Sequence, residues 1–260
     1  MKHALDCLKE IERGLKRKNP LFLLDYDGTL TPIVGDPKKA LLSDDMSGVL
    51  KRISKSRKIG IISGRALEDI RNLVRVDDIY YSGNHGFEIS GPELEIINPA
   101  AEEIKPVILE ICTKMQKKLD HVDGALIENK GLTASLHYRR VANKDFPELK
   151  EGFERVVKPY VDEGKVRVTR GRKVFEIRPN IDWNKGDAVL YITKTLREDG
   201  ILPIYIGDDR TDEDAFTALK DTGITILVSP EPKKSNARYF LRSSDEVKLF
   251  LVRILEDTGE

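Results

Sequence analysis

Short apolar runs alternate with helix-spaced apolar residues through the first third of the chain. Leu21–Leu24 and Ile59–Ile62 are unbroken apolar runs that end in polar residues. Such runs are typical of strands that are buried on both faces of a parallel sheet. Apolar positions recur at helical spacing in residues 46–53 and 67–74, and a third short strand is predicted at residues 79–81. This alternation of strands and helices predicts βαβ units around a parallel sheet.

Residues 98–180 follow a different pattern. A long amphipathic helix is predicted over residues 104–119. Apolar and polar side chains alternate strictly from Leu132 to Arg139, which is typical of a half-buried strand in an antiparallel sheet. A further helix and two more strands are expected at residues 153–161, 166–168 and 173–178. We therefore expect an inserted α+β domain whose sheet has one open, polar face.

The strand–helix alternation returns in the last part of the chain. The predicted elements are a helix at 186–197, a strand at 201–206, a helix that begins near Asp212, a strand at 224–228 and a helix over 247–254. At the other end of the chain, apolar residues at helical spacing predict a helix over residues 5–15. Residues 1–97 and 181–260 are thus predicted to form one discontinuous α/β core, which the domain at 98–180 interrupts.

The composition excludes several classes of protein. The 44 basic and 44 acidic residues give zero formal net charge, whereas proteins that bind nucleic acid through its phosphates normally have a basic excess. No apolar run reaches the roughly 18–20 residues that cross a membrane, and the N-terminus lacks the apolar core of a signal peptide. Two distant cysteines, Cys7 and Cys112, make neither a disulfide framework nor a zinc site. We expect a cytoplasmic protein without a nucleic-acid or membrane partner.

Polar residues follow the ends of the predicted core strands. They are Asp25 and Asp27, Ser63 and Arg65, Asn84 and His85, and Asp208 and Asp209. An isolated Asp at such a place is usually a helix cap or a turn residue. Ligands of parallel sheets, however, bind beyond the carboxyl ends of the strands, so several carboxylates would meet in one crevice. Like charges this close need a cation, and oxygen ligands without His or Cys favour Mg²⁺.

The segment Asp25–Thr31, which reads DYDGTLT, resembles the first motif of the haloacid dehalogenase (HAD)-like phosphatase superfamily. Ser63, Lys185 and the segment Gly207–Asp212 resemble its second, third and fourth motifs. The chain is more similar still to the trehalose-6-phosphate phosphatase family. The shared motifs are DYDGTLTPI, SGR, GNHG-E, E-x-K, HYR, EIRP, NKG-A and IGDDRTDEDAF, which run from Asp25 to Phe216.

This resemblance implies a HAD-like Rossmannoid parallel-sheet core with an inserted C2-type cap, and Mg²⁺-dependent hydrolysis of trehalose 6-phosphate. Asp25 would be the nucleophile that forms an aspartyl-phosphate, and Asp27 the general acid and base. Ser63 would donate a hydrogen bond to the phosphate, while Lys185 would neutralise its charge and steady Asp25. The implied metal residues are Asp25, the backbone carbonyl of Asp27, and Asp208, with Asp209 and Asp212 holding metal-bound waters or completing the shell.

Sugar recognition needs polar side chains that hydrogen-bond hydroxyl groups. The core candidates are Arg65, Asn84 and His85. The candidates in the cap are Glu128, Lys130, Arg139, Arg172 and Glu176. Each of the cap residues alone would be interpreted as part of an ordinary ion pair on a sheet face, and the family motifs favour the substrate-binding interpretation for Glu128, Lys130 and Glu176.

Other functions stay open at this point. A HAD phosphatase of sucrose phosphate or glucosylglycerate phosphate would share the core and differ in the cap, and a phosphomutase would share the chemistry but retain its phosphorylated product. An inactive module that senses sugar phosphate would be expected to lack Asp25 or Asp27, and both are present. We expect a monomer that acts on a small sugar phosphate, and any coupling to a trehalose-phosphate synthase would be with a separate chain.

Overall fold

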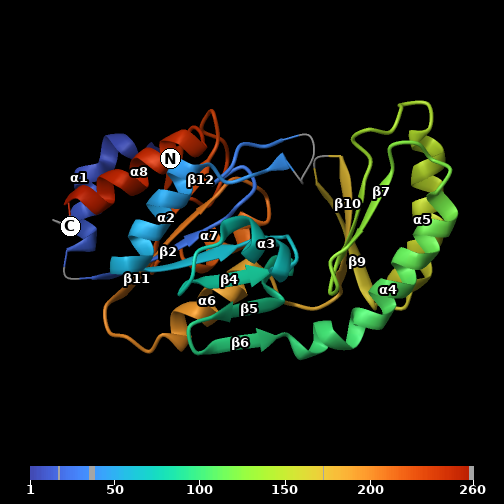
Figure 1. Cartoon of the computed structure of the whole chain (residues 1–260), viewed down its shortest axis with the longest axis horizontal. Coiled ribbons are helices and arrows are strands. Elements are labelled where there is room, and N and C mark those ends of the chain that lie inside the picture. Colours follow the sequence, from blue (N-terminus) through green and yellow to red (C-terminus); the bar gives the residue numbers. More distant parts are fainter. Residues whose placement is uncertain (17, 35–38, 172, 258–260) are drawn as a thin grey trace. The chain divides into compact units, whose positions relative to one another are not determined.

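The computed structural model describes residues 1–16, 18–34, 39–171 and 173–257. The chain divides into two compact units (Figure 1), a core unit of Met1–Ile96 with Trp183–Glu260 and an inserted unit of Ile97–Asp182. The sequence patterns put the corresponding boundaries after residues 97 and 180. Among the described helices, none is long and apolar enough to cross a membrane.

A mostly parallel sheet organises the core unit. Its strands are β1 (Lys2–His3), β2 (Asn19–Leu24), β3 (Lys58–Ile62), β4 (Tyr80–Gly83), β5 (Glu88–Gly91), β6 (Leu94–Ile97), β11 (Ile201–Gly207), β12 (Ile224–Val228) and β13 (Tyr239–Leu241). Their order within the described residues is β1-β13-β12-β11-β2-β3-β4-β5-β6. Neighbouring strands are parallel from β1 to β4, and β5 then pairs antiparallel with β4.

Helices cover both faces of this sheet, so its central strands are buried on both sides. Side chains of α1 (Leu8–Leu15), α2 (Asp44–Ser56), α3 (Leu67–Val74) and α8 (Ser244–Asp257) share one apolar cluster with one face of the strands. The other face packs against α6 (Lys185–Thr195) and α7 (Asp212–Ala218). Two short 3₁₀ turns, Leu5–Cys7 and Asn84–Gly86, complete the described helical segments. This two-sided cover explains why unbroken apolar runs form the strands.

The inserted unit packs two helices on one face of an antiparallel sheet. Its helices are α4 (Pro99–Leu119) and α5 (Phe146–Asp162), and its strands β7 (Leu126–Asn129), β8 (Ala134–His137), β9 (Val166–Gly171) and β10 (Val174–Pro179) lie in the order β7-β8-β10-β9. Phe153 of α5 stacks on Phe175 of β10 with ring centroids 4.6 Å apart. The two aromatic rings lie in an apolar cluster to which both helices and the sheet contribute. The inserted unit therefore has a hydrophobic core of its own.

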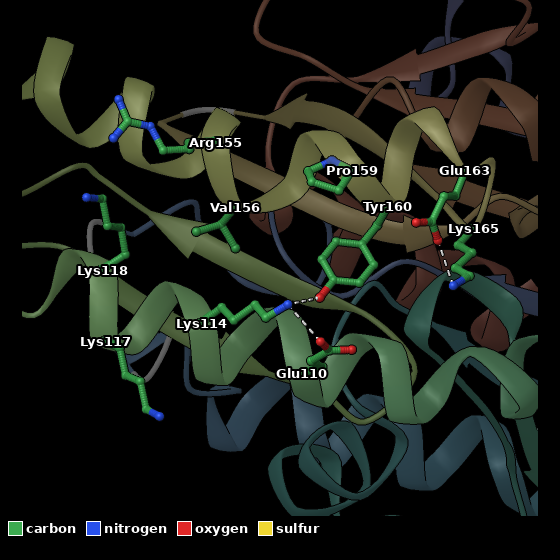
Figure 2. A pocket seen from close by; sticks show the side chains of 10 residues that line it. All are labelled: Glu110, Lys114, Lys117, Lys118, Arg155, Val156, Pro159, Tyr160, Glu163 and Lys165. Atoms are coloured by element: carbon green, nitrogen blue, oxygen red, sulfur yellow. Dashed lines mark hydrogen bonds and ion pairs between the residues drawn. The ribbon is translucent and has the colours of Figure 1, made fainter.

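The helical side of the inserted unit carries a shallow hollow of about 640 Å³ between α4 and α5 (Figure 2). Four of its charged side chains form two pairs. Lys114 Nζ contacts Glu110 Oε1 at 2.7 Å and donates to the Tyr160 hydroxyl at 2.7 Å, and Lys165 contacts Glu163 at 2.7 Å. The residues that line this hollow are not among those predicted for the functional site.

The expected α/β class, with its mostly parallel sheet, is confirmed. The elements that the sequence patterns do not indicate are β1, β5, β6, β7 and β13. Each of them is short, and pairing with a neighbouring strand rather than local sequence makes it a strand. The predicted strand that runs from Leu132 to Arg139 is shorter in the structure, because β8 ends at His137 and the chain then turns, with Val141 N donating to Tyr138 O.

Candidate active site

The site lies where four neighbouring strands of the core sheet end. β11, β2, β3 and β4 lie side by side and parallel, so their carboxyl ends share one edge of the sheet. The residues that follow these ends are Asp208, Asp25, Ser63 and Asn84. Ligands of parallel sheets bind at this edge.

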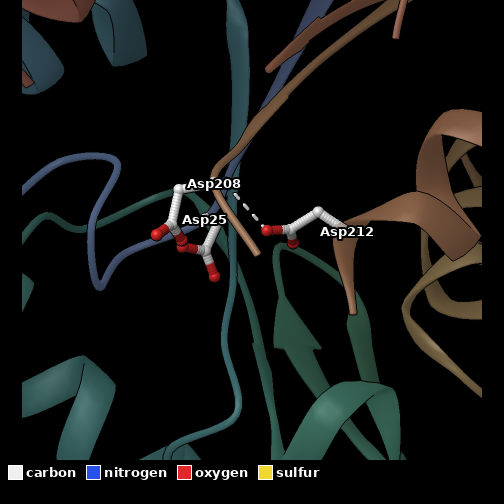
Figure 3. Close-up of side chains that lie close together, drawn as sticks. All are labelled: Asp25, Asp208 and Asp212. Carbon is white, nitrogen blue, oxygen red and sulfur yellow. Dashed lines mark hydrogen bonds between the residues drawn. The ribbon is translucent and has the colours of Figure 1, made fainter. Parts of the chain in front are cut away.

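Three carboxylates gather there (Figure 3). One oxygen each of Asp25, Asp208 and Asp212 lies within 4.8 Å of the others, a grouping that could hold a metal ion. Asp25 and Asp212 are buried, and Asp208 is half-buried. Asp209, which was also predicted for the metal site, lies outside this group. Its side chain is exposed and accepts a hydrogen bond from the amide of Arg210 at 2.6 Å.

Lys185 neutralises part of this negative charge. Its Nζ donates to Asp25 Oδ1 at 2.6 Å and to Asp212 Oδ1 at 2.7 Å, and its side chain is only 3% exposed. Lys185 is the first residue of α6, and a capping box defines this helix end. Asn184 Oδ1 accepts from the amides of Gly186 and Asp187, and the Asp187 carboxylate accepts from the Asn184 amide. The local sequence NKGD therefore sets the direction of the lysine.

Burial and charge act differently on the two partners of this ion pair. Burial raises the pKa of Asp25 well above its ordinary value; Lys185 opposes this rise, and the carboxylates of Asp212 and Asp208 add to it. Burial alone would lower the pKa of Lys185, but the charges of Asp212 and Asp25 outweigh it and raise this pKa. Lys185 thus stays an ammonium, and one ammonium is too little for three carboxylates. A divalent cation would supply the missing positive charge.

Asp212 accepts hydrogen bonds on both carboxylate oxygens. Its Oδ1 accepts from Lys185 and from the Tyr205 hydroxyl, both at 2.7 Å. Its Oδ2 accepts from the backbone amides of Asp208 and Asp209, both at 2.9 Å. The sequence motifs predict Asp212 for the site but do not indicate Tyr205, whose position inside an apolar strand resembles any core aromatic.

Gly28 allows the first motif to pass close to Asp208. The glycine has a φ of +87°, and a Cβ added to it would lie 2.2 Å from Asp208 Oδ2. An L residue with a side chain would therefore be strained by its φ and would also displace the carboxylate.

Asp27 and Arg65 form a bidentate ion pair. Arg65 Nε donates to Asp27 Oδ2 and Arg65 Nη2 to Asp27 Oδ1, both at 2.7 Å, and Nη1 donates to Asp69 at 3.0 Å. The side chain of Asp27 is 46% exposed, whereas that of Arg65 is 9% exposed. The sequence predicts Arg65 as a substrate-binding residue. In the structure an arginine contacts the Asp27 carboxylate directly.

The remaining core candidates brace the loop after β3. The Ser63 hydroxyl accepts from the Arg65 amide at 3.2 Å, and the backbone amides of Asn84 and His85 donate to Arg65 O and Ser63 O. Asn84 is fully buried and its amide nitrogen donates to Glu88 at 2.5 Å. The buried His85 ring packs against Gly64, where an added Cβ would lie 2.4 Å from His85 Cε1. Asn84 and His85 both have a positive φ, of 49° and 58°.

Three candidates of the inserted unit lie on the sheet face opposite its helices. Glu128 Oε2 contacts His137 Nε2 at 2.8 Å, and Lys130 Nζ contacts Glu176 Oε1 at 3.7 Å. Arg178 Nη2 also donates to Glu176. The site prediction missed this arginine, although it lies only two residues from Glu176 on the same face. Arg139 follows the end of β8. Arg172, also predicted for this site, lies outside the described residues.

Polar atoms on this face are left without partners. Glu128, Ser135, Glu176 and Thr169 lie opposite one another in the strand register. Within the described part of the chain, the buried hydroxyls of Ser135 and Thr169 and the Nε atom of Arg178 have no hydrogen-bond partner. The face was expected to be open, but Ser135 is only 1% exposed, since charged neighbours flank it in the register. Buried unpaired donors of this kind suit a ligand with many hydroxyl groups.

Comparison with known proteins gives consistent matches. Residues 23–245 match the family described as trehalose-phosphatase. The chain is 40% identical over 267 residues to trehalose-phosphate phosphatase B of Arabidopsis thaliana, covering 97% of this chain and 71% of that protein. It is also 40% identical over 262 residues to the probable trehalose-phosphate phosphatase 4 of Oryza sativa subsp. japonica, covering 97% and 70%.

Solved structures resemble both the fold and the sequence. The C-terminal domain of C. albicans trehalose-6-phosphate phosphatase matches with a TM-score of 0.79 and 26% identity, over 95% of this chain and 96% of that one. The Aspergillus fumigatus trehalose-6-phosphate phosphatase matches with a TM-score of 0.66 and 26% identity, over 99% and 100%.

Because Gly28 lies so close to Asp208, replacing this glycine should destabilise the protein more than replacing an ordinary glycine of positive φ. Gly131 is a matched control, because its φ is +84° and an added Cβ would meet no described atom within 4 Å. Gly131→Ala should lose only about 1–2 kcal/mol of local stability from its left-handed conformation. Gly28→Ala should lose roughly 1–3 kcal/mol more, because Asp208 must also move. Peptide-resolved hydrogen exchange measures the loss of stability at Gly28 in the core unit and at Gly131 in the inserted unit. Equal losses would show that the approach to Asp208 imposes no constraint.

Proposed function

The chain belongs to the trehalose-phosphatase family, and from this membership we propose that it hydrolyses trehalose 6-phosphate to trehalose and phosphate. The observation that carries the proposal is the buried contact of Lys185 with Asp25 beside the carboxylates of Asp208 and Asp212. A carboxylate that is fixed by an ammonium and lies next to a cation site suits attack on a phosphomonoester. The proposal assigns catalysis to the core unit and sugar recognition to the inserted unit as a cap.

The chemistry takes two steps. An Asp25 oxygen attacks phosphorus while the bond from phosphorus to the sugar oxygen breaks, and Asp27 gives its proton to that oxygen. Asp27 then removes a proton from water, the water oxygen attacks phosphorus, and the bond to Asp25 breaks to release phosphate. Lys185 fixes the rotation of the Asp25 carboxylate by binding Oδ1. Ser63 is assigned as a donor to a phosphate oxygen. Because Arg65 binds both oxygens of Asp27, Asp27 must leave Arg65 before it acts as an acid.

We assign Mg²⁺ as the cation. Carboxylate oxygens without a His or Cys ligand fit a hard divalent ion. Asp25, Asp208 and the backbone carbonyl of Asp27 would hold it, and Asp209 would hold water at the exposed side. When bound, Mg²⁺ offsets the negative charge of the carboxylates and of the phosphoryl group.

Sugar recognition is assigned to the polar sheet face of the inserted unit. Glu128 contacts His137 and Lys130 contacts Glu176 on this face, and Arg178 fixes one oxygen of Glu176. The unpartnered Ser135 hydroxyl beside them supports binding of a polyhydroxylated group. Trehalose 6-phosphate has such a group on the side away from its phosphate.

Phosphate release from a panel of sugar phosphates tests the proposal. In the presence of Mg²⁺, kcat/KM for trehalose 6-phosphate should exceed those for glucose 6-phosphate and sucrose 6-phosphate by about 100-fold, because unpaired polar groups penalise a wrong sugar. Asp25→Asn should lower kcat by about 10⁴ or more while the circular dichroism spectrum is unchanged. If the protein prefers another sugar phosphate, the substrate assignment is refuted. If Asp25→Asn remains active, the assignment of Asp25 as the nucleophile is refuted.

Thermal unfolding tests the cation site without substrate. At a concentration of about 100 times its Kd, MgCl₂ should raise the Tm by about 5–10 °C over NaCl of equal ionic strength, because the folded state alone has the assembled carboxylates. Asp208→Asn should abolish this rise, whereas the same change at the exposed neighbour Asp209 should largely keep it. If Asp209→Asn abolished the rise and Asp208→Asn did not, the ligand assignment would be wrong.

Two glutamates of the inserted unit allow a matched test of sugar recognition. Glu128 pairs with His137 at 2.8 Å, and Glu148 pairs with His121 at 2.9 Å away from the polar sheet face. Glu128→Gln should lower kcat/KM for trehalose 6-phosphate by about tenfold or more, yet change that for p-nitrophenyl phosphate by less than about twofold. Glu148→Gln should change neither. Equal losses of Glu128→Gln on both esters would contradict a role in sugar binding.

A further inference from the structure

The carboxylate of Asp212 is saturated by hydrogen bonds from the chain itself. A carboxylate offers about four lone-pair sites. Lys185 Nζ and the Tyr205 hydroxyl bind Oδ1, and the amides of Asp208 and Asp209 bind Oδ2. Asp212 is 0% exposed. A direct bond from Asp212 to a cation would cost one of these hydrogen bonds, so the geometry favours a carboxylate that holds other groups in place.

The Tyr205 hydroxyl has no role in the apolar packing around it. Tyr205 lies on β11, three residues before Asp208, and its ring meets Phe216 edge-on with centroids 5.7 Å apart. A phenylalanine would fill the same volume of this apolar cluster without burying an oxygen. A buried hydroxyl is costly unless it is hydrogen-bonded, and its partner here is Asp212 at 2.7 Å.

We propose that Tyr205 is a positioning residue of the active site, which acts through Asp212 on Lys185 and on the backbone of Asp208. This inference rests on the proposed function and adds a residue to it. The rigid ring places the hydroxyl, the hydroxyl fixes Asp212 Oδ1, and Asp212 fixes the turn that carries Asp208.

The Tyr205 hydroxyl also determines how the ammonium of Lys185 is shared between Asp25 and Asp212. Lys185 lies between Asp25 Oδ1 at 2.6 Å and Asp212 Oδ1 at 2.7 Å. Without the hydrogen bond from Tyr205, the charge on Asp212 Oδ1 is satisfied by Lys185 alone, and the ammonium moves toward Asp212. The nucleophile Asp25 then loses part of its orientation. Because Tyr205 touches neither substrate nor cation in this scheme, its removal affects turnover more than substrate affinity.

Tyr205→Phe tests the proposal, with Tyr81→Phe as its matched control. The Tyr81 hydroxyl is also buried in the core sheet and donates to Val76 O at 2.7 Å, away from the acidic cluster. Tyr205→Phe should lower kcat for trehalose 6-phosphate by about tenfold or more, with KM changed less than about twofold. Without substrate, calorimetry should show the Kd of Mg²⁺ raised by about tenfold. Tyr81→Phe should leave both constants unchanged.

Hydrogen exchange of the backbone amides gives an independent test of the proposal. The amides of Asp208 and Asp209 should exchange slowly in the wild type and faster in Tyr205→Phe, and should stay slow in Tyr81→Phe. If Tyr205→Phe matches Tyr81→Phe in kcat, Mg²⁺ affinity and amide exchange, the proposal is overturned. It is also overturned if Tyr205→Phe fails to fold while Tyr81→Phe folds, because the hydroxyl would then serve the fold.

The proposed function and this inference can fail separately. A wild type that releases no phosphate from trehalose 6-phosphate refutes the function, whereas the Mg²⁺ affinity and amide exchange of the Tyr205 variant still report on the network. A wild type that hydrolyses trehalose 6-phosphate alongside an unimpaired Tyr205→Phe variant refutes the inference alone.

Discussion

The buried ammonium of Lys185 is the interaction on which the rest of the site depends. It lies between Asp25 and Asp212 and is almost inaccessible to solvent. A buried charge is stable only with partners close by, so the two carboxylates and the lysine must come together in the folded chain. Three distant segments meet this requirement at the end of β2, at the start of α6 and at the start of α7. The capping box at Asn184 gives the lysine its starting direction.

The acidic cluster exists because the order of the strands brings it together. β2 lies between β11 and β3, so Asp25 meets Asp208 on one side and the Ser63 loop on the other. Parallel pairing directs all these ends to the same edge. Gly28 then lets the first motif approach Asp208 more closely than any residue with a side chain could. The same arrangement gathers negative charge, which favours a cation at the site.

The sequence predicts those parts that depend on local patterns. Unbroken apolar runs locate β2, β3 and β11, and motif order predicts Asp25, Lys185 and Asp212. It does not indicate β5 or β13, because pairing with a neighbour makes these short strands. It also does not indicate Tyr205, since a buried tyrosine looks like a core aromatic until its hydroxyl is seen beside Asp212. Arg65 is predicted as a substrate-binding residue, and only three-dimensional contacts show that it pairs with Asp27.

The two aspartates of the first motif are held in opposite ways, which suits the different tasks proposed for them. Asp25 is buried beside the ammonium of Lys185, which holds its carboxylate in one orientation. Asp27 is 46% exposed and pairs with a guanidinium that Asp69 also binds. Because the Asp27 carboxylate can turn toward solvent whereas that of Asp25 is buried, releasing the proposed acid costs less than releasing the proposed nucleophile would. A nucleophile needs a fixed position, whereas an acid that serves first the leaving oxygen and then water needs freedom to move. The unequal burial of two residues only two positions apart provides both.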